Sequence, residues 1–392
     1  MTGRSPQSSD RTTGEPAGED AAERGSASFF RDLRILEVGD VAMFKQAVPG
    51  STELVWTGPD GDIEGVGRPT GFDPRRLPAL RRAFDRAEFD LVVGHVPPWS
   101  PWDPRRVVAM LRRFRRRAPA LVVRSLGIRL LARPTRTPLA VLDLGDPAII
   151  RPHNFDLLDR ARVYFKRELP TDRWKVFAGG LARDLPSRQQ RTALRFAGWC
   201  AKLQPISLAV SPARAADIAV AATSPPEKTV DVFFAGQVES SSTVRTTGLP
   251  ELRALGREGI RVDLPPERLD RREFYRRCAR AWITWSPEGH GWECFRHYEA
   301  ALCGSVPLMN QPSIVRHAPL RADEHALYYH VEPGDLARSV RAALVDRSRL
   351  GRMAASARTH VRRHHMLDRL CEHVVRACLG GAPGARPGSI DP

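Results

Sequence analysis

The chain lacks the features that define several broad classes of protein. Its 392 residues contain no apolar run of the ~18–20 residues that a membrane-spanning helix needs. Residues 1–28 are polar and have no apolar core, so we do not expect export through a secretory signal peptide. The six cysteines form no Cys-x-x-Cys pair, which favours reduced thiols in a cytoplasmic protein over a disulfide framework or a structural zinc site.

Lysine is also scarce, although the chain is strongly basic. Only five of the 61 basic residues are Lys, and the formal net charge is +16. Arginine is spread along the whole sequence, and no recognition helix, zinc finger or ladder of aromatic and basic residues accompanies it. This scatter argues against a nucleic-acid partner. A non-enzymatic protein that binds nucleic acid or anionic lipid is kept as an alternative.

Residues 105–117 form the densest basic segment. Val107, Val108, Leu111 and Phe114 recur within it at helical spacing, which predicts an amphipathic helix with a cationic outer face. The favoured interpretation is a surface helix of an α/β domain whose apolar stripe packs on a sheet. The alternative is peripheral contact with an anionic membrane.

Apolar, β-prone segments alternate with helical patterns along most of the chain, which is typical of doubly wound α/β domains. The length allows two domains, each with its own core. We expect a disordered tail over 1–30, a first Rossmann-like domain over 31–205, a second over 206–365, a further helix over 366–379 and a flexible tail over 380–392.

Two expected strands of the first domain end in polar residues. One covers 89–96 and contains His95, and the other covers 139–146 and ends with Asp146. Ligands of doubly wound sheets bind at the carboxyl ends of the strands, so His95 and Asp146 are placed at the expected ligand edge. The capping of a turn or helix is the alternative for either residue alone.

The segment from Trp285 to Pro307 carries the most specific signal. It predicts, in order, a strand over 281–285, a loop with Gly289 and Gly291, a helix over 293–303 and a strand over 306–309. Gly304 stands where a left-handed cap ends the helix. A loop with free N–H groups that leads into a helix N-terminus is an anion-binding site.

Arg296 and Glu299 are three residues apart on this helix and therefore share one face. Arginine binds phosphate oxygens in a bidentate manner, and a carboxylate accepts hydrogen bonds from ribose hydroxyls. The pair and the loop together indicate a pocket for a nucleoside diphosphate. The alternative is a solvated ion pair that contributes a few tenths of a kcal/mol.

Two motifs in this region are shared with a known family. Arg296-x-x-Glu299-Ala300, followed by Gly304-x-x-Pro307, resembles the sugar-nucleotide-binding region of the two-domain GT-B glycosyltransferases. The similarity is greatest to the group-1 and spore-protein CgeB-like branch and more distant to the exostosin domain. It implies two Rossmann-like domains that face each other across a cleft, the first for the acceptor and the second for the nucleotide sugar. The helix over 366–379 would return to the first domain.

The resemblance implies an enzyme that moves a sugar from a nucleoside-diphosphate sugar to an acceptor hydroxyl of a natural product, polysaccharide or lipid-linked saccharide. No metal or cofactor is expected, because helix N-terminal amides and arginines would stabilise the leaving diphosphate. The Asp60-Gly61-Asp62 sequence has the letters of a metal-binding motif, but its Gly-Pro-Asp-Gly-Asp context is a turn signature. Another GT-B-type enzyme, such as a sugar epimerase, is a further alternative.

By resemblance, contacts with the nucleotide sugar are expected from Gly236, Arg245, Gly289, His290, Gly291, Trp292, Arg296 and Glu299. Arg296 would also act in catalysis by stabilising the leaving group. An inverting enzyme would need a base, for which Asp146 is the first candidate and His95 the second.

The stereochemical outcome stays open at this point. Many retaining members of the family space two glutamates as Glu-x7-Glu. Glu299 matches the second of them, but Glu288 and Glu293 lie eleven and six residues before it. The resemblance alone favours a retaining enzyme.

Overall fold

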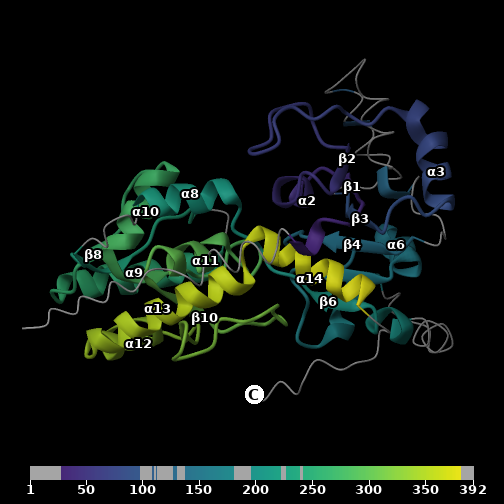
Figure 1. Ribbon diagram of the computed structural model, residues 1–392. Helices are drawn as coiled ribbons and strands as arrows, with labels where there is room; N and C mark the ends of the chain where they lie inside the picture. Colours follow the sequence, from purple (N-terminus) through teal and green to yellow (C-terminus); the bar gives the residue numbers. More distant parts are fainter. Residues whose placement is uncertain are drawn as a thin grey trace, which may run out of the picture.

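The computed structural model describes residues 28–97, 108–109, 112, 127–129, 137–180, 196–221, 227–238 and 242–380. These residues form two α/β domains, each built on a parallel β-sheet (Figure 1). The predicted class, α/β with two Rossmann-like domains, is confirmed. Residues 1–27 and 381–392 of the two expected tails and most of the 105–117 segment lie outside the described residues. Phe30, at the end of the tail expected over 1–30, is described and is buried in the core of the first domain.

The first domain contains six parallel strands in the order β2-β1-β3-β4-β5-β6. They are β1 (Ile35–Gly39), β2 (Thr52–Trp56), β3 (Leu91–His95), β4 (Leu139–Asp143), β5 (Val163–Lys166) and β6 (Leu203–Pro205). Its described helices include α2 (Met43–Ala47), α3 (Leu77–Asp85) and α6 (Phe155–Arg160), with 3-10 segments at Pro74–Arg76, Pro152–Asn154 and Arg173–Gly180. The sequence pattern does not predict β2 and β6, because these edge strands are only partly buried and lack a continuous apolar run.

Both faces of the first sheet are covered, which explains the apolar runs of its central strands. On one face, Leu36 of β1 belongs to a buried cluster with Phe84 of α3. On the other face, Ile35 belongs to a cluster with Leu370 and Val374 of α14 (Leu367–Leu379). The first domain therefore completes its core with a helix from the end of the chain.

The second domain contains five parallel strands in the order β11-β10-β9-β7-β8. They are β7 (Val230–Phe233), β8 (Val262–Asp263), β9 (Ala281–Trp285), β10 (Val306–Asn310) and β11 (Leu327–Tyr329). The helices that cover them include α8 (Pro212–Ala221), α9 (Thr243–Arg257), α10 (Arg271–Arg280), α11 (Phe295–Leu302), α12 (Asp335–Leu344) and α13 (Arg347–His364). Gly304 follows α11 with a φ of 76°, the left-handed conformation that its position predicts.

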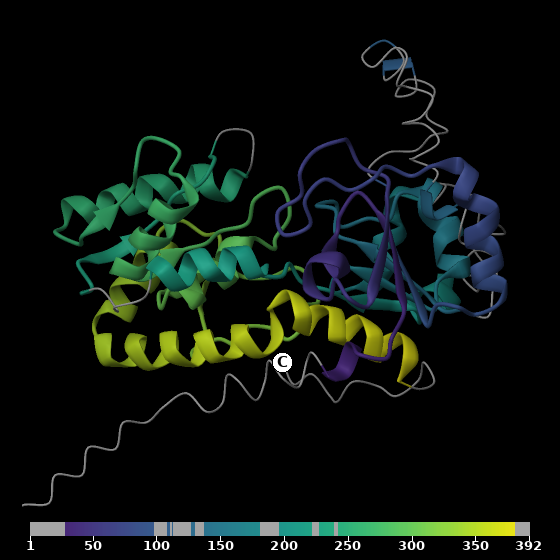
Figure 2. The same cartoon turned by 45° about the horizontal axis from the view of Figure 1, so that its top comes forward.

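The chain crosses between the domains twice, and the two crossings lie side by side. The backbone N–H of Val210 donates to the carbonyl of His365 at 2.8 Å, and the N–H of Leu367 donates to the carbonyl of Val210 at 3.1 Å. Beyond the second crossing, α14 continues from α13 and packs on the first domain (Figure 2). This is the returning helix that the GT-B resemblance implies. No described helix is both long and apolar enough to span a membrane.

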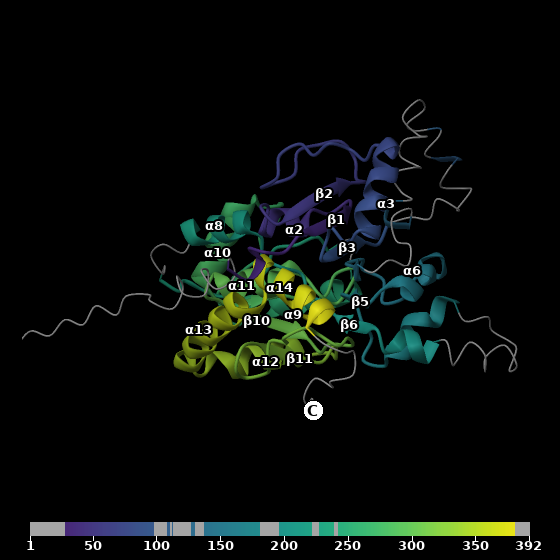
Figure 3. The same cartoon turned by 45° about the vertical axis from the view of Figure 1, so that its right-hand side comes forward.

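Strand order reverses once in each sheet, between β1 and β3 and between β7 and β9. The connections on the two sides of such a point lead in opposite directions, and in doubly wound sheets the resulting crevice at the carboxyl ends binds the ligand. We call these two places the first and second reversal points. A loop of the first domain also reaches the second domain (Figure 3). Glu64 of this loop forms an ion pair of 2.7 Å with Arg271.

Candidate active site at the two reversal points

A cavity of about 340 Å³ lies at the first reversal point. Asp40 follows β1, His95 ends β3, and Asp143 and Asp146 lie at and just beyond the end of β4, and all four line the cavity. The two predicted candidates for a catalytic base therefore share one cavity. The parallel sheet brings them together because it aligns the carboxyl ends of its strands at one edge.

His95 is buried and held by Glu37, a residue that the sequence patterns do not single out. Nε2 of His95 lies 2.8 Å from Oε1 of Glu37, and this carboxylate also accepts hydrogen bonds from the backbone N–H groups of Phe44 and Lys45. In the tautomer whose Nε2 donates to this carboxylate, Nδ1 is the acceptor. Nδ1 is buried and has no hydrogen-bond partner among the described residues.

The aspartates at the end of β4 and in the loop after it form hydrogen bonds and ion pairs with neighbouring side chains. Asp143 accepts a hydrogen bond of 3.0 Å from the Tyr164 hydroxyl and forms an ion pair of 3.2 Å with Lys166. Burial lowers the pKa of Lys166, and the neighbouring charge of Asp143 opposes that shift. Asp146 is bound by Arg167. Its carboxylate is thus already engaged by a guanidinium group.

The second reversal point brings together four of the residues predicted to bind the nucleotide sugar. Gly236 follows β7, Gly289 follows β9, and Arg245 and Arg296 lie in the first turns of α9 and α11. A Cβ atom added at Gly236 would lie 2.4 Å from Nη2 of Arg296, and one added at Gly289 would lie 2.8 Å from Nη2 of Arg245. Each glycine therefore permits the close approach of an arginine.

The two arginines have different environments. Arg245 is buried and joins two loops, since its Nε donates to the carbonyl of Glu288 at 2.9 Å and its Nη1 to the carbonyl of Gln237 at 2.7 Å. Arg296 lies against Phe234, with its Cζ 5.1 Å from the ring centroid. Its Nε and Nη1 are buried without a partner among the described residues, and burial lowers its pKa. Arg296 therefore has donors to offer to an anion.

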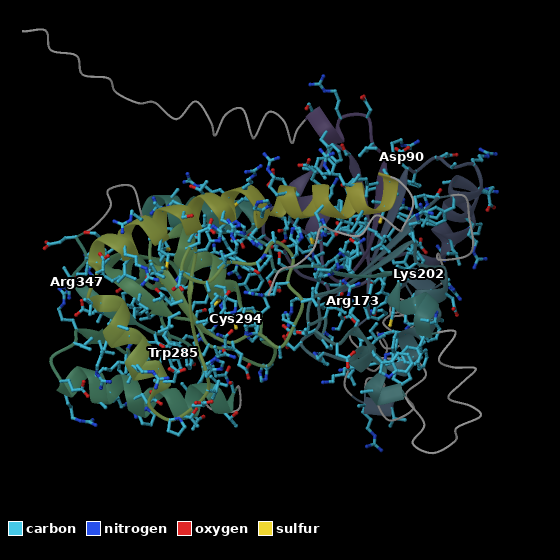
Figure 4. The ribbon with its side chains drawn as sticks, turned by 90° about the horizontal axis from the view of Figure 1, so that it is seen from below. Asp90, Arg173, Lys202, Trp285, Cys294 and Arg347 are labelled. Carbon is cyan, nitrogen blue, oxygen red and sulfur yellow. The ribbon has the colours of Figure 1, made fainter. Side chains whose placement is uncertain are left out.

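The loop between β9 and α11 is fixed by its own domain. The backbone N–H of Glu288 donates to Oδ1 of Asn310 at 2.9 Å, and His297 of α11 is bonded to a backbone carbonyl of the loop at 3.1 Å. Burial lowers the pKa of His297 to about 3, so its ring is neutral. Figure 4 shows Cys294, which ends the loop, on the side of the second domain that faces Arg173 of the first.

The same loop contacts the first domain through Glu168, which lies two residues after β5. Its Oε2 accepts from the backbone N–H of Trp292 at 2.9 Å, and its Oε1 accepts from that of Glu293 at 3.0 Å. Arg167 lies 3.3 Å from the Glu168 carboxylate and also binds Asp146 of the cavity. The two reversal points are thus joined through Arg167 and Glu168.

The other predicted contacts lie differently. His290 is exposed in the loop, and Trp292 is buried with its indole N–H bonded to a backbone carbonyl at 3.1 Å. Glu299 is buried, is bound by Arg214 of α8 and accepts from the Tyr275 hydroxyl of α10 at 3.0 Å. The side-chain hydrogen bonds of Glu299 therefore go to α8 and α10.

The sequence patterns miss four residues of this arrangement, which are Glu37, Arg167, Glu168 and Asn310. A signal exists for Glu37, because it is a charged residue inside an apolar run. Central strands of a parallel sheet are buried on both faces, and a buried carboxylate needs donors. Arg167 and Glu168 directly follow a strand and so stand at the ligand edge. Nothing in the sequence indicates which loop they meet.

No protein-family model matches the chain, and no curated protein matches it. Solved structures similar to it include sucrose-phosphate synthase from Thermosynechococcus elongatus, with 11% identity over 87% of this chain and 97% of that chain and a TM-score of 0.46. An α-glucosyltransferase solved with UDP and a 13-mer DNA has 8% identity over 88% of this chain and 99% of that chain and a TM-score of 0.46. HepE from Anabaena, solved with UDP, has 13% identity over 93% of this chain and 96% of that chain and a TM-score of 0.42.

Proposed function

We propose that the chain is a glycosyltransferase that moves a sugar from a nucleoside-diphosphate sugar to an acceptor hydroxyl. The observation that carries this proposal is the junction at Arg167, which binds Asp146 of the first cavity. A Cβ atom added at Gly291 in the loop of the second domain would lie 3.0 Å from Nη2 of the same Arg167. A site with a potential base and a site with guanidinium donors therefore adjoin, as a reaction between two substrates requires.

The second reversal point would hold the donor. The bond between the sugar and the β-phosphate breaks during transfer, and negative charge builds on the leaving diphosphate. Arg296 can stabilise this charge with preorganised N–H donors in a partly buried site. We infer that the guanidinium group fills the role that a divalent metal fills in other transferases.

The first cavity would hold the acceptor. We favour His95 over Asp146 as the base, because Asp146 is bound by Arg167 while Nδ1 of His95 has no partner among the described residues. Nδ1 would take the proton of the acceptor hydroxyl while the hydroxyl oxygen bonds to the anomeric carbon of the donor sugar. Glu37 would be a positioning residue that keeps the proton on Nε2.

A base in this position favours inversion, in contrast to the retention that the family resemblance alone favours. In a retaining enzyme the leaving phosphate can take the acceptor proton, and no base is needed. The anomeric configuration of the product, measured by NMR, separates the two outcomes.

The acceptor classes compatible with this proposal are natural products, polysaccharides and lipid-linked saccharides. A cytoplasmic enzyme that contacts a membrane through residues 105–117 would favour the lipid-linked class. Transfer to soluble glycosides, compared with transfer to acceptors in vesicles that contain anionic lipid, distinguishes these classes.

The donor site is tested by thermal unfolding with UDP, GDP, dTDP, CDP and ADP, each with Mg²⁺ and with EDTA. We expect one nucleotide to stabilise the protein by about 2.7 kcal/mol at a concentration of 100 times its Kd, with or without the metal. Arg296→Ala should remove this stabilisation. Arg338→Ala, on an exposed side chain paired with Asp335, should leave it intact.

Absence of stabilisation by every nucleotide in a folded wild-type protein would contradict the proposal. Stabilisation that requires Mg²⁺ would contradict the role assigned to Arg296.

A further inference from the structure

The carboxylate of Glu168 occupies an anion-binding position in the second domain. Its two oxygens accept hydrogen bonds from two consecutive backbone N–H groups, those of Trp292 and Glu293, at 2.9 and 3.0 Å. These groups belong to the loop that leads into α11, where backbone donors and the helix dipole favour negative charge. The loop therefore already binds an anion, and that anion comes from the first domain.

The loop is shaped for this carboxylate. A Cβ atom added at Gly291 would lie 2.5 Å from Oε1 of Glu168, so a side chain at this position would displace the carboxylate. The Glu168 side chain is 3% exposed, and burial raises its pKa although Arg167 and the two amides oppose the shift. The contact thus binds a carboxylate that has lost most of its solvation, and this carboxylate regains hydration when another anion takes its place.

We propose that Glu168 is an internal competitor of the donor diphosphate for the backbone N–H groups of Trp292 and Glu293. A phosphate oxygen that binds these groups displaces the carboxylate, and displacement breaks a contact between the two domains. Donor binding and the separation of the domains at this contact are therefore coupled. The identification of the incoming anion as a donor diphosphate rests on the proposed function.

Two variants, one in each domain, remove the competitor by unrelated means. Glu168→Gln removes the charge and keeps the shape of the side chain. Gly291→Ala keeps the charge and displaces the carboxylate by steric contact. The affinities of inorganic pyrophosphate and of UDP for the full chain are measured by calorimetry, with thermal unfolding as the check of folding. We expect both variants to bind pyrophosphate roughly 5-fold or more tightly than wild type, the lower end of typical coupling between sites.

Glu64→Gln is the matched control, because it removes a different ion pair between the domains, the one with Arg271. It should leave both affinities within about 2-fold of wild type, a change below typical coupling between sites. An equal gain in Glu64→Gln would assign the effect to general loosening of the domains and overturn the proposal. Unchanged or weaker pyrophosphate binding in Glu168→Gln and Gly291→Ala would also overturn it, since the carboxylate would then only support the loop.

The two proposals fail separately. A gain in pyrophosphate affinity without binding of any nucleotide would retain the competition and remove the donor assignment. Nucleotide binding that is lost in Arg296→Ala but is unchanged in Glu168→Gln and Gly291→Ala would retain the donor assignment and remove the competition. Amide hydrogen exchange adds a local measurement, because pyrophosphate should keep the N–H groups of Trp292 and Glu293 protected in Glu168→Gln.

Discussion

At the first reversal point three aspartates line a cavity with His95, whereas the second places two arginines beside two glycines. Both places are produced by the same event, a change in the direction of strand order in a parallel sheet. The topology therefore provides a reversal point in each domain, and the residues after the strand ends decide its chemistry. The first reversal point has acceptors for the proton of a hydroxyl, and the second has donors for an anion.

The two places also differ in how they are supported. The polar groups of the first site lie on or directly after strands, and Glu37 of β1 fixes His95 of β3 within one sheet. The second site depends on a loop that is bound by Asn310, Arg245 and, across the domain boundary, Glu168. Domain movement would leave the contacts of the strand-based site intact, whereas the loop-based site would lose its contact with Glu168.

Replacing His95 should have the largest effect and should act on the first site alone. We expect His95→Gln to lower kcat by roughly 10²–10⁴-fold, because the acceptor hydroxyl loses its base. The affinity for the donor nucleotide should stay within about 2-fold, since catalysis rather than uniform binding is lost. Steady-state kinetics and calorimetry on the same preparation check this division. A variant with unchanged kcat would show that the leaving phosphate takes the proton, as in a retaining enzyme.

A smaller effect is expected at the second site from Gly236→Ala. The added methyl group would lie 2.4 Å from Nη2 of Arg296 and would move the guanidinium group. Since hydrogen bonds to charged groups contribute about 1.5–3 kcal/mol, we expect nucleotide affinity to fall by roughly 10-fold or more. Gly256→Ala in α9 has no non-local atom closer than 3.9 Å to the added methyl group and serves as the control. Equal nucleotide affinities of Gly236→Ala and Gly256→Ala would show that Arg296 does not bind the nucleotide.

The third prediction concerns the pH dependence of stability and lies outside both sites. Burial raises the pKa of Glu293 from 4.5 to about 8, although the Tyr298 hydroxyl opposes the shift. The fold therefore favours the protonated acid, and its contribution to stability is fully present below pH 4.5 and is lost as pH rises through 8. Glu293→Gln imitates the neutral form and should show a smaller loss of Tm between pH 4.5 and 8, the window that the two pKa values set.

Thermal unfolding across this pH range compares the two proteins. Glu324→Gln, on a side chain that is 46% exposed, is the control and should follow the wild-type curve. Parallel curves for wild type and Glu293→Gln would contradict the assignment of a neutral acid at this position.

Most strands and helices that line the two sites follow from local sequence patterns. The expected strand over 281–285 coincides with β9, and Gly304 adopts the predicted left-handed conformation. The edge strands β2 and β6 are missed, because an edge strand needs no continuous apolar run. A local sequence pattern indicates whether an element is buried and where it begins and ends. Both features depend on residues that are close in the sequence.

The candidate site was predictable in part. The segments after β7 and β9 carry glycines and arginines, and these residue types indicate an anion site from the local sequence alone. The structure brings Gly236, Arg245, Gly289 and Arg296 together. Glu299 could not be assigned in this way, because its hydrogen bonds go to Arg214 and Tyr275 of other helices. Helical spacing specifies which residues share a face and does not specify what that face meets.

The sequence by itself determined the α/β class, the alternation of strands and helices and the glycine-bearing loop before α11, since these depend on contacts within a few residues. The tertiary structure alone decided that Glu37 holds His95 and that Glu168 binds the loop 124 residues away. Parallel strands that pair are separated by whole crossovers, so their register and the neighbours of their ends are settled by packing of the complete chain. Charged partners at such distances leave no periodic signal, because each is a single residue whose solvation is replaced only in the folded protein.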